Sequence, residues 1–190
     1  MNECEKYRDF VESVAFYPHC GERSIDSLVY PVLGLSGETS ELFEKVWQGD
    51  LDKVSSDDAR DGVLKEAGDV LWYVVRICTE AGIDVTNLYR SAQAFDVHRD
   101  GFVKNYFLSL MVITAGEISE KFKKALRDGG GSLPEDYADF IRGKLKVILI
   151  SMSVFASFYD ATLKDIAAMN VEKLISRRDR GVLSGEGDNR

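Results

Sequence analysis

Two pairs of acidic residues, each spaced three positions apart, are the side chains of this sequence best suited to carry out chemistry. The first pair is Glu38 and Glu41, and the second is Glu66 and Asp69. On a helix, residues three apart emerge from the same face about one turn apart. If two such helices pack together, the carboxylates meet and repel by about 4 kcal/mol for each pair at ~4 Å and an effective dielectric constant near 20.

A bound cation would offset this repulsion. Mg²⁺ prefers oxygen ligands and binds substrate phosphates as well as carboxylates. We therefore expect Mg²⁺, with Mn²⁺ as an alternative, to be held by Glu38, Glu41, Glu66 and Asp69. Either acidic pair alone would more often be a solvated helix face. Small residues beside both pairs favour close helix approach; they are Gly37, Ser40, Ala67 and Gly68.

The elements that must position these acids are helices. Apolar residues recur at helical spacing along almost the whole chain, and no strand-like run of comparable length competes with them. The predicted helices are 5–16, 25–48, 57–81, 85–95, 101–127, 134–159 and 163–180. Their expected end signals are Ser56, Gly82, Asp84, Pro134 and Thr162 with Asp165. We predict an all-α helical bundle, in which Leu35, Leu42 and Val46 pack against Val63, Val70 and Val74.

Composition narrows the class of protein further. The chain has 190 residues, with 24 Lys and Arg against 32 Asp and Glu, and a net charge of -8. This acidic balance argues against a nucleic-acid partner, because such binding needs a basic surface. The three cysteines form neither a disulfide framework nor a zinc motif, so we expect a cytoplasmic location. The N-terminus has no secretory signal, and the most apolar stretch, 145–159, is too short to span a membrane.

An internal repeat describes the domain organisation. The segment GETSELFEK begins at Gly37, and the similar segment GEISEKFKK begins at Gly116, so the offset between 37 and 116 is 79 residues. Helical and polar segments follow in the same order after each. We predict a tandem duplication with halves 25–100 and 101–180, packed as one body and flanked by an N-terminal helix within 1–24 and a glycine-rich tail at 181–190. The alternative is a chance similarity between two amphipathic helices.

The acidic pairs also carry a family resemblance. They lie within YPVLGLSGETSELFEK and KEAGDVLWY, which resemble the all-α nucleoside triphosphate pyrophosphohydrolases of the MazG and dimeric dUTPase type. The C-terminal end is similar to the closing segment of phage-type MazG-like proteins, from Asn170 through Lys173 to Gly181. The resemblance covers most of the chain. It implies Mg²⁺-dependent hydrolysis of a nucleoside triphosphate, an NTP or dNTP, to the monophosphate and pyrophosphate.

The resemblance also implies roles for individual residues. The four acids would hold the metal ions that orient the triphosphate and activate a water for attack on the α-phosphorus. Glu41 is the first candidate for the catalytic base and Glu38 the second. Lys45 would contact a phosphate or form an ion pair with Glu41. Tyr73 would contact the sugar and Trp47 would stack on the base; core packing is the alternative for both rings.

The two halves lack complementary parts of the family pattern. At the repeat offset, Glu66 and Asp69 correspond to Leu145 and Ile148, although the second half keeps Glu117 and Glu120. The first half lacks the C-terminal group of polar residues. We therefore predict a single composite site, with metal ligands from the first half and substrate contacts from Asn170, Lys173, Arg177 and Arg180; the alternative for these cations is a charge interaction with the helix dipole. A non-catalytic bundle that senses nucleotides or binds a protein stays an alternative, and the apolar helices leave room for a homodimer of pseudo-dimers.

Overall fold

The computed structural model describes residues 2–52, 57–92, 99–129 and 136–182. Within these ranges the chain forms seven α-helices and one 3₁₀ turn, and it contains no strand. The prediction of an all-α fold is therefore confirmed. The elements are α1 (Glu3–Val14), the 3₁₀ turn η1 (Asp26–Leu28), α2 (Val29–Asp52), α3 (Asp57–Glu80), α4 (Val85–Ser91), α5 (Gly101–Asp128), α6 (Tyr137–Ser157) and α7 (Leu163–Asp179).

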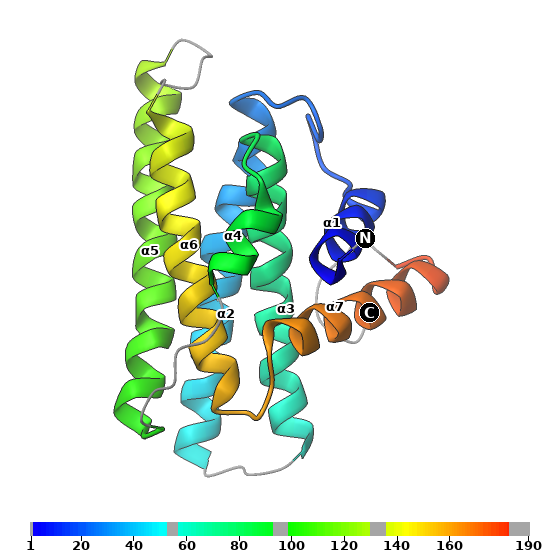
Figure 1. Cartoon of the computed structure of the whole chain (residues 1–190), viewed down its shortest axis with the longest axis vertical. Helices are drawn as coiled ribbons and strands as arrows, with labels where there is room; N and C mark the ends of the chain where they lie inside the picture. The colour runs from blue at the N-terminus through cyan, green and yellow to red at the C-terminus, as the bar shows by residue number, and fades with distance from the viewer. Residues whose placement is uncertain (1, 53–56, 93–98, 130–135, 183–190) are drawn as a thin grey trace.

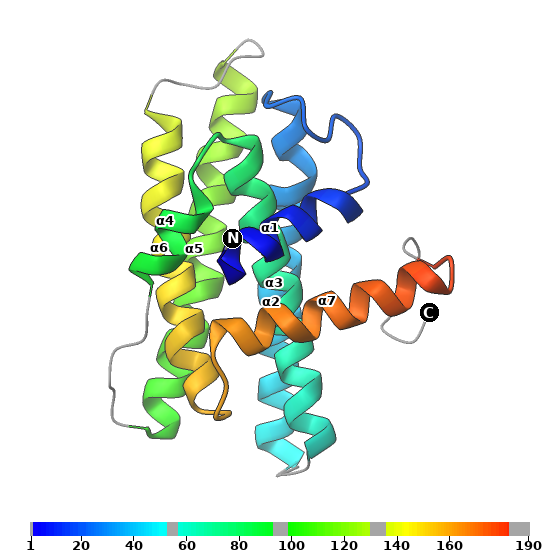
Figure 2. The same cartoon turned by 45° about the vertical axis from the view of Figure 1, so that its right-hand side comes forward.

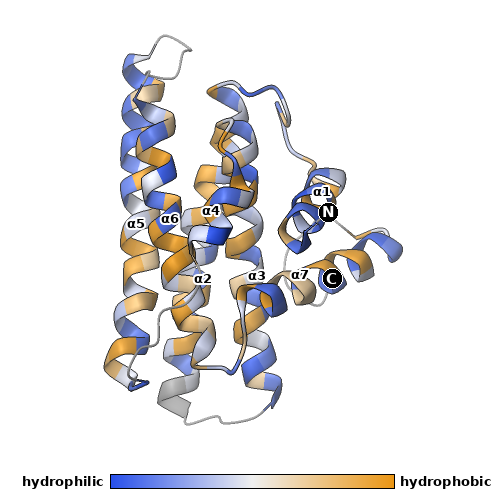
Figure 3. Ribbon diagram, viewed as in Figure 1, coloured by the Kyte–Doolittle hydropathy of each residue, from blue (hydrophilic) through white to orange (hydrophobic). Residues whose placement is uncertain are grey.

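Four long helices form the body of the molecule. Helices α2, α3, α5 and α6 lie side by side; α2 is antiparallel to α3 and α5 is antiparallel to α6, whereas α3 and α5 run in the same direction (Figure 1). Their apolar faces enclose the core, and the hydropathy colouring shows orange patches between them (Figure 3). The six residues predicted to pack α2 against α3 are all buried; they are Leu35, Leu42, Val46, Val63, Val70 and Val74. In the described part of the chain, no helix is both long and apolar enough to cross a bilayer.

Three shorter helices cover this bundle. Helix α7 lies across α3 and contacts α1, which packs against α3 from the same side (Figure 2). Helix α4 lies on α6. Each half of the chain therefore sends its last helix onto the hairpin formed by the other half. This arrangement places residues of α7 beside residues of α3 that precede them by about one hundred positions.

Helix ends confirm some of the predicted signals and correct others. Asp84 caps α4, Thr162 and Asp165 form a capping box on α7, and Gly82 takes the left-handed conformation, with φ 67°, after α3. Ser56 and Pro134 lie outside the described residues. The helix expected to begin at residue 25 begins instead at Val29. The preceding residues form η1, where Ser24 and Ser27 bond each other's backbone and compete with helical hydrogen bonding.

The N-terminal helix also differs from the prediction. It spans Glu3–Val14 rather than 5–16, because Asn2 and Glu5 form a capping box that sets its first turn two residues earlier. Ala15 then adopts an extended conformation with ψ 124° and ends the helix. Helix α4 ends at Ser91, four residues before the predicted end, and residues 93–98 lie outside the described ranges.

Candidate functional site

Three of the four predicted acids meet where α2 packs against α3. Glu38 from α2 and Glu66 and Asp69 from α3 each offer a carboxylate oxygen, and these oxygens all lie within 4.8 Å of one another. Glu66 is buried, while Glu38 and Asp69 are half-buried. The three carboxylates could hold a metal ion, because oxygen atoms from converging carboxylates are the ligands that hard divalent cations take.

Burial and the convergence of the acids raise the pKa of one of them, Glu38. Burial, followed by the negative charges of Asp69, Glu41 and Glu66, raises the pKa of Glu38 from 4.5 to about 8. Lys173 opposes this shift but does not cancel it. A carboxyl group with such a pKa keeps its proton at neutral pH unless a further positive charge arrives. The site is therefore electrostatically suited to a cation.

Two lysines lie against the same carboxylates. Lys45 of α2 donates from Nζ to Glu66 Oε1 at 2.6 Å, and Lys173 of α7 donates from Nζ to Asp69 Oδ2 at 2.5 Å. The Lys45–Glu66 pair differs from the ion pair with Glu41 that the sequence suggested. The Lys45 side chain reaches Glu66 by passing over Gly62 of α3. A Cβ added at Gly62 would lie 3.0 Å from Lys45 Cε.

Asn170 connects α7 to the carboxylates and to α1. Its amide nitrogen donates to Asp69 Oδ1 at 3.1 Å, and its amide oxygen accepts from the hydroxyl of Tyr7 at 2.8 Å. Asn170 is fully buried, so both of its polar ends need these partners. Gly68 makes the contact possible, since an added Cβ there would lie 2.9 Å from Asn170 Cβ.

Two tyrosine rings, Tyr30 and Tyr73, lie beside the carboxylates and form an aromatic wall. Tyr73 follows Asp69 by one turn of α3; burial, then the contact with Tyr30 and the charges of Glu38 and Asp69, raise its pKa. Tyr30 of α2 lies against it, with ring centroids 5.9 Å apart and the hydroxyl oxygens 3.4 Å apart. The Tyr73 ring occupies the position of a side chain at Gly34, where an added Cβ would lie 2.1 Å from the ring.

Four predicted site residues lie apart from this group or at its margin. Glu41 is exposed and is not one of the three converging acids, although its charge reaches Glu38. Trp47 is 54% exposed and stacks on Phe43; it follows Glu38 by nine residues, which places it on the opposite face of α2. Arg177 is buried on the same face of α7 as Lys173. Arg180 is exposed and donates to the Ser176 carbonyl of its own helix.

The small residues beside the acids have different roles from those expected. Gly68 does permit a close approach, but the approaching helix is α7 rather than α2. The expectation for Gly37 is wrong, because an added Cβ at this exposed position would meet nothing within 4 Å. The glycine of α2 that a neighbouring group does require is Gly34, through Tyr73.

The acidic pair of the second half has a different environment. Glu117 binds Lys144 at 2.7 Å, and Glu120 is paired with Lys123 and Lys124, all on exposed or half-exposed surface. Leu145 and Ile148, at the repeat offset from Glu66 and Asp69, are fully buried in the core. In the second half, the two acids are therefore paired with lysines, and apolar side chains occupy the positions that correspond to Glu66 and Asp69.

Sequence reasoning missed two tyrosines of the site. The sequence predicts a separate N-terminal helix around Tyr7, and its motifs assign no role to Tyr30. The apolar spacing of Cys4, Tyr7 and Val11 indicates the buried face of α1. It carries no information about which buried polar group the Tyr7 hydroxyl would reach.

A comparison with known proteins places the chain in a family. It is 37% identical to the Gene 37 protein of Mycobacterium phage L5 over 86 residues, which are 45% of this chain and 75% of the phage protein. The chain belongs to the family of that phage protein. No protein-family model matches the chain, and no solved structure matches it. Since the name of the phage protein describes no activity, the function has to be argued from the site.

Proposed function

We propose that this chain is a Mg²⁺-dependent nucleoside triphosphate pyrophosphohydrolase of the all-α, MazG-like type, which converts an NTP or dNTP to the monophosphate and pyrophosphate. The observation that carries this proposal is the convergence of Glu38, Glu66 and Asp69 within 4.8 Å, beside lysines from two different helices. A cation site next to positive side chains and an aromatic wall suits a substrate that has both a polyphosphate and a nucleoside.

The donor set fits Mg²⁺ or Mn²⁺. All three groups are carboxylates without a histidine or thiolate among them, and hard oxygen donors favour these ions. The raised pKa of Glu38, which follows from burial and from the neighbouring negative charges that Lys173 does not cancel, supports a cation at this position. When bound, the ion would neutralise phosphate charge and make a coordinated water more acidic.

Residues of this chain would hold the cation, accept a proton and contact the phosphates. Glu38, Glu66 and Asp69 hold the cation. Glu41, one turn beyond Glu38 and more exposed, is the carboxylate available to accept a proton from the attacking water. Lys45 and Lys173 supply positive charge for the phosphates at the edge of the site.

A tandem duplication accounts for the architecture. Helices α2 and α3 form one antiparallel hairpin, α5 and α6 form another, and α7 and α4 cross to the opposite hairpin. Ser36, which directly precedes the first repeat segment, and Ser119, within the second, contact each other through their hydroxyls at 2.6 Å. In this proposal, the first half supplies the acids and the second supplies Asn170 and Lys173. The duplication leaves one composite site for each chain.

Release of pyrophosphate from a panel of NTPs and dNTPs, with and without Mg²⁺, tests the proposed activity. We expect wild-type turnover that depends on the metal, and a loss of at least about a hundredfold in Asp69→Asn, because one ligand and its hydrogen-bonded support are removed together. Asp61→Asn is the matched control, since Asp61 lies on the same helix and pairs with the neighbouring Arg60 on a partly exposed surface. It should keep wild-type activity.

Two outcomes would contradict the proposal. Full turnover by Asp69→Asn with unchanged helicity would remove the carboxylates from the mechanism. Nucleotide binding by the wild type without pyrophosphate release would instead identify a nucleotide-sensing protein.

A further inference from the structure

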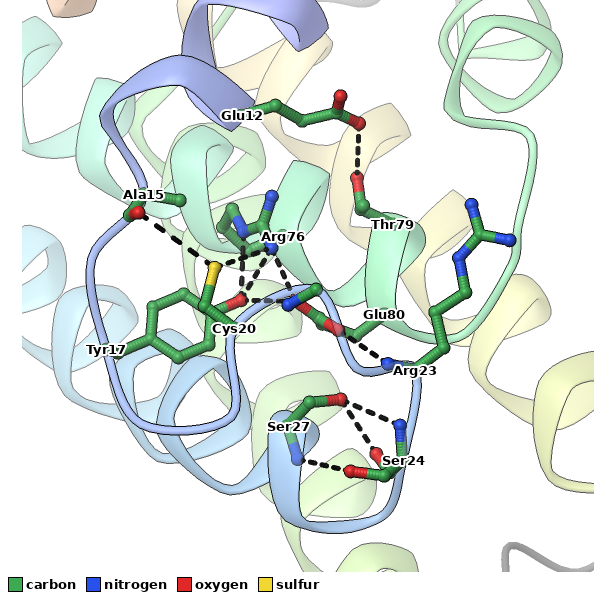
Figure 4. Close-up of polar contacts among 11 residues, drawn as sticks. Glu12, Ala15, Tyr17, Cys20, Arg23, Ser24, Ser27, Arg76, Thr79 and Glu80 are labelled. Carbon is green, nitrogen blue, oxygen red and sulfur yellow. Dashed lines mark hydrogen bonds and ion pairs between the residues drawn. The ribbon is translucent and has the colours of Figure 1, made fainter.

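A buried ion pair lies on α3 beyond the carboxylates. Arg76 and Glu80 are 2% and 1% exposed, and Arg76 Nη2 donates to Glu80 Oε1 at 2.5 Å (Figure 4). Both charges belong to one helix, so they do not join two helices directly. A buried pair of this kind is costly unless the remaining hydrogen-bonding positions of both groups are also occupied.

The segment that connects α1 to η1 occupies those positions. The Tyr17 hydroxyl accepts from Arg76 Nε at 2.9 Å and Nη2 at 2.8 Å, and donates to Glu80 Oε1 at 2.7 Å. The backbone N–H groups of Gly21 and Arg23 donate to the two oxygens of Glu80 at 2.8 and 3.2 Å. Burial acts to raise the pKa of Glu80, but the Gly21 N–H, the Tyr17 hydroxyl and further donors hold it below its usual value. Residues 15–24 are called the latch segment below.

The latch segment holds a backbone shape that these contacts must maintain. His19 and Arg23 have φ values of 62° and 52°, and Gly21 has 85°. Non-glycine residues in the left-handed region are disfavoured and persist where surrounding contacts determine them. Arg76 also donates from Nη2 to Cys20 Sγ at 3.3 Å, so a second group of the segment, besides the Tyr17 hydroxyl, accepts from the guanidinium.

Tyr17 also connects the latch segment to the candidate site through ring contacts. Its ring stacks on Tyr30 with centroids 4.9 Å apart and an interplanar angle of 10°, and Tyr30 in turn contacts Tyr73. Trp72 packs edge-on against both Tyr17 and Tyr73. A continuous series of aromatic contacts therefore runs from the buried ion pair to the ring that lies beside Glu38.

We propose that Arg76 and Glu80 are positioning residues for substrate: through Tyr17 they fix Tyr30 and Tyr73 as the surface that receives the nucleoside. This inference rests on the proposed function, because it assigns these rings to the nucleoside part of the substrate. The latch segment sets the affinity for the nucleoside and leaves the polyphosphate and cation interactions unchanged, since Arg76 and Glu80 bond each other and the latch segment.

Tyr17→Phe tests the inference, because it removes the hydroxyl through which the latch segment bonds both Arg76 and Glu80, while keeping the ring. The first readout is the labelling rate of Cys20 by a thiol reagent, since Cys4 and Cys78 are buried and Cys20 is half-buried. We expect labelling about tenfold faster than in the wild type, from the loss of a buried hydrogen-bonding group that holds the segment closed. Cys20→Ser supplies the blank.

The second readout separates nucleoside from polyphosphate. In Tyr17→Phe, KM for the nucleotide should rise about fivefold, the size expected for a disordered aromatic contact, with kcat unchanged. Inhibition by inorganic tripolyphosphate should stay at the wild-type level. Tyr30→Leu should raise KM in the same way but leave Cys20 labelling slow, because it removes the wall without opening the latch segment.

Tyr137→Phe is the matched control. Tyr137 is fully buried in α6, and its hydroxyl has no hydrogen-bond partner among the described residues. The same loss of a buried hydroxyl should change neither KM nor labelling. Urea unfolding of each variant establishes that it is folded under assay conditions.

The outcomes distinguish this inference from the proposed function. If the wild-type protein releases no pyrophosphate, the proposed function is wrong. The role of the latch segment is then tested by comparing Cys20 labelling and the affinity for a non-hydrolysable nucleotide between the wild type and Tyr17→Phe. With an active wild type, unchanged KM in Tyr17→Phe overturns the inference, and so does a fall in kcat with equal loss of tripolyphosphate inhibition.

Discussion

The raised pKa of Glu38 makes the stability of the metal-free protein depend on pH in a way that Glu38→Gln should remove. The pKa is about 8 in the folded chain and near 4.5 when unfolded, so the folded state binds the proton more tightly. The resulting contribution to stability is fully present below pH 4.5. It is lost as the pH rises towards and through 8.

The magnitude follows from the same shift. A change from 4.5 to about 8 corresponds to at most about 5 kcal/mol at ~1.4 kcal/mol for each pKa unit. Because Glu38 is partly exposed and shares its charge with neighbouring acids, solvent screening reduces this ceiling, and we expect about 1–2 kcal/mol to be measured. Glutamine keeps the size of the side chain and cannot ionise. The variant should therefore match the wild type at pH 5 and exceed its stability by about 1–2 kcal/mol at pH 9.

Urea unfolding in the presence of a chelator, from pH 5 to pH 9, measures the difference. Glu44→Gln is the control, because Glu44 is exposed on the same helix and its change should leave the pH dependence parallel to that of the wild type. Added Mg²⁺ at a hundred times its Kd should increase the free energy of unfolding of the wild type by about 2.7 kcal/mol, and that of Glu38→Gln by much less. Parallel curves for wild type and Glu38→Gln would refute the electrostatic account of this site.

Three further predictions concern packing, the buried ion pair and stoichiometry. Gly68→Ala should destabilise the fold by about 1–3 kcal/mol, since its Cβ would press on Asn170, whereas Gly37→Ala should stabilise it by up to about 1 kcal/mol; thermal unfolding compares the two. Arg76→Met should cost about 3–5 kcal/mol in urea unfolding because it leaves Glu80 charged and buried, and the double variant Arg76→Met, Glu80→Leu should cost less than Arg76→Met alone. Isothermal titration with a non-hydrolysable nucleotide should give one site per chain, and two equivalent sites would contradict the composite site.

Local sequence patterns were enough to predict most helices because their causes are local. A capping box such as Thr162 with Asp165 satisfies backbone groups within one turn, and Gly82 can adopt a positive φ without help from distant residues. The start of α2 was predicted wrongly, because its position depends on side-chain hydrogen bonds as well as on apolar spacing. Ser24 and Ser27 redirected the start of α2 through hydrogen bonds that the apolar periodicity does not record.

The candidate site was predicted in part for the same reason. The three-residue spacing placed Glu66 and Asp69 on one face of α3, and they do converge. It could not decide between Glu38 and Glu41, since positions three apart differ by about 60° around a helix. The rotation of α2 about its axis, set by Leu35, Leu42 and the rest of the core, brings Glu38 to α3 and leaves Glu41 exposed.

The sequence by itself determined the all-α class and the carboxylate chemistry, because periodicity, caps and donor types are properties of short segments. Only the tertiary structure decided that Asn170 and Lys173 meet Asp69, that Tyr7 supports Asn170, and that Tyr17 completes a buried ion pair. These contacts join residues up to 163 positions apart. They depend on how helices cross, which is set by side-chain packing over the whole core and has no signature in any single segment.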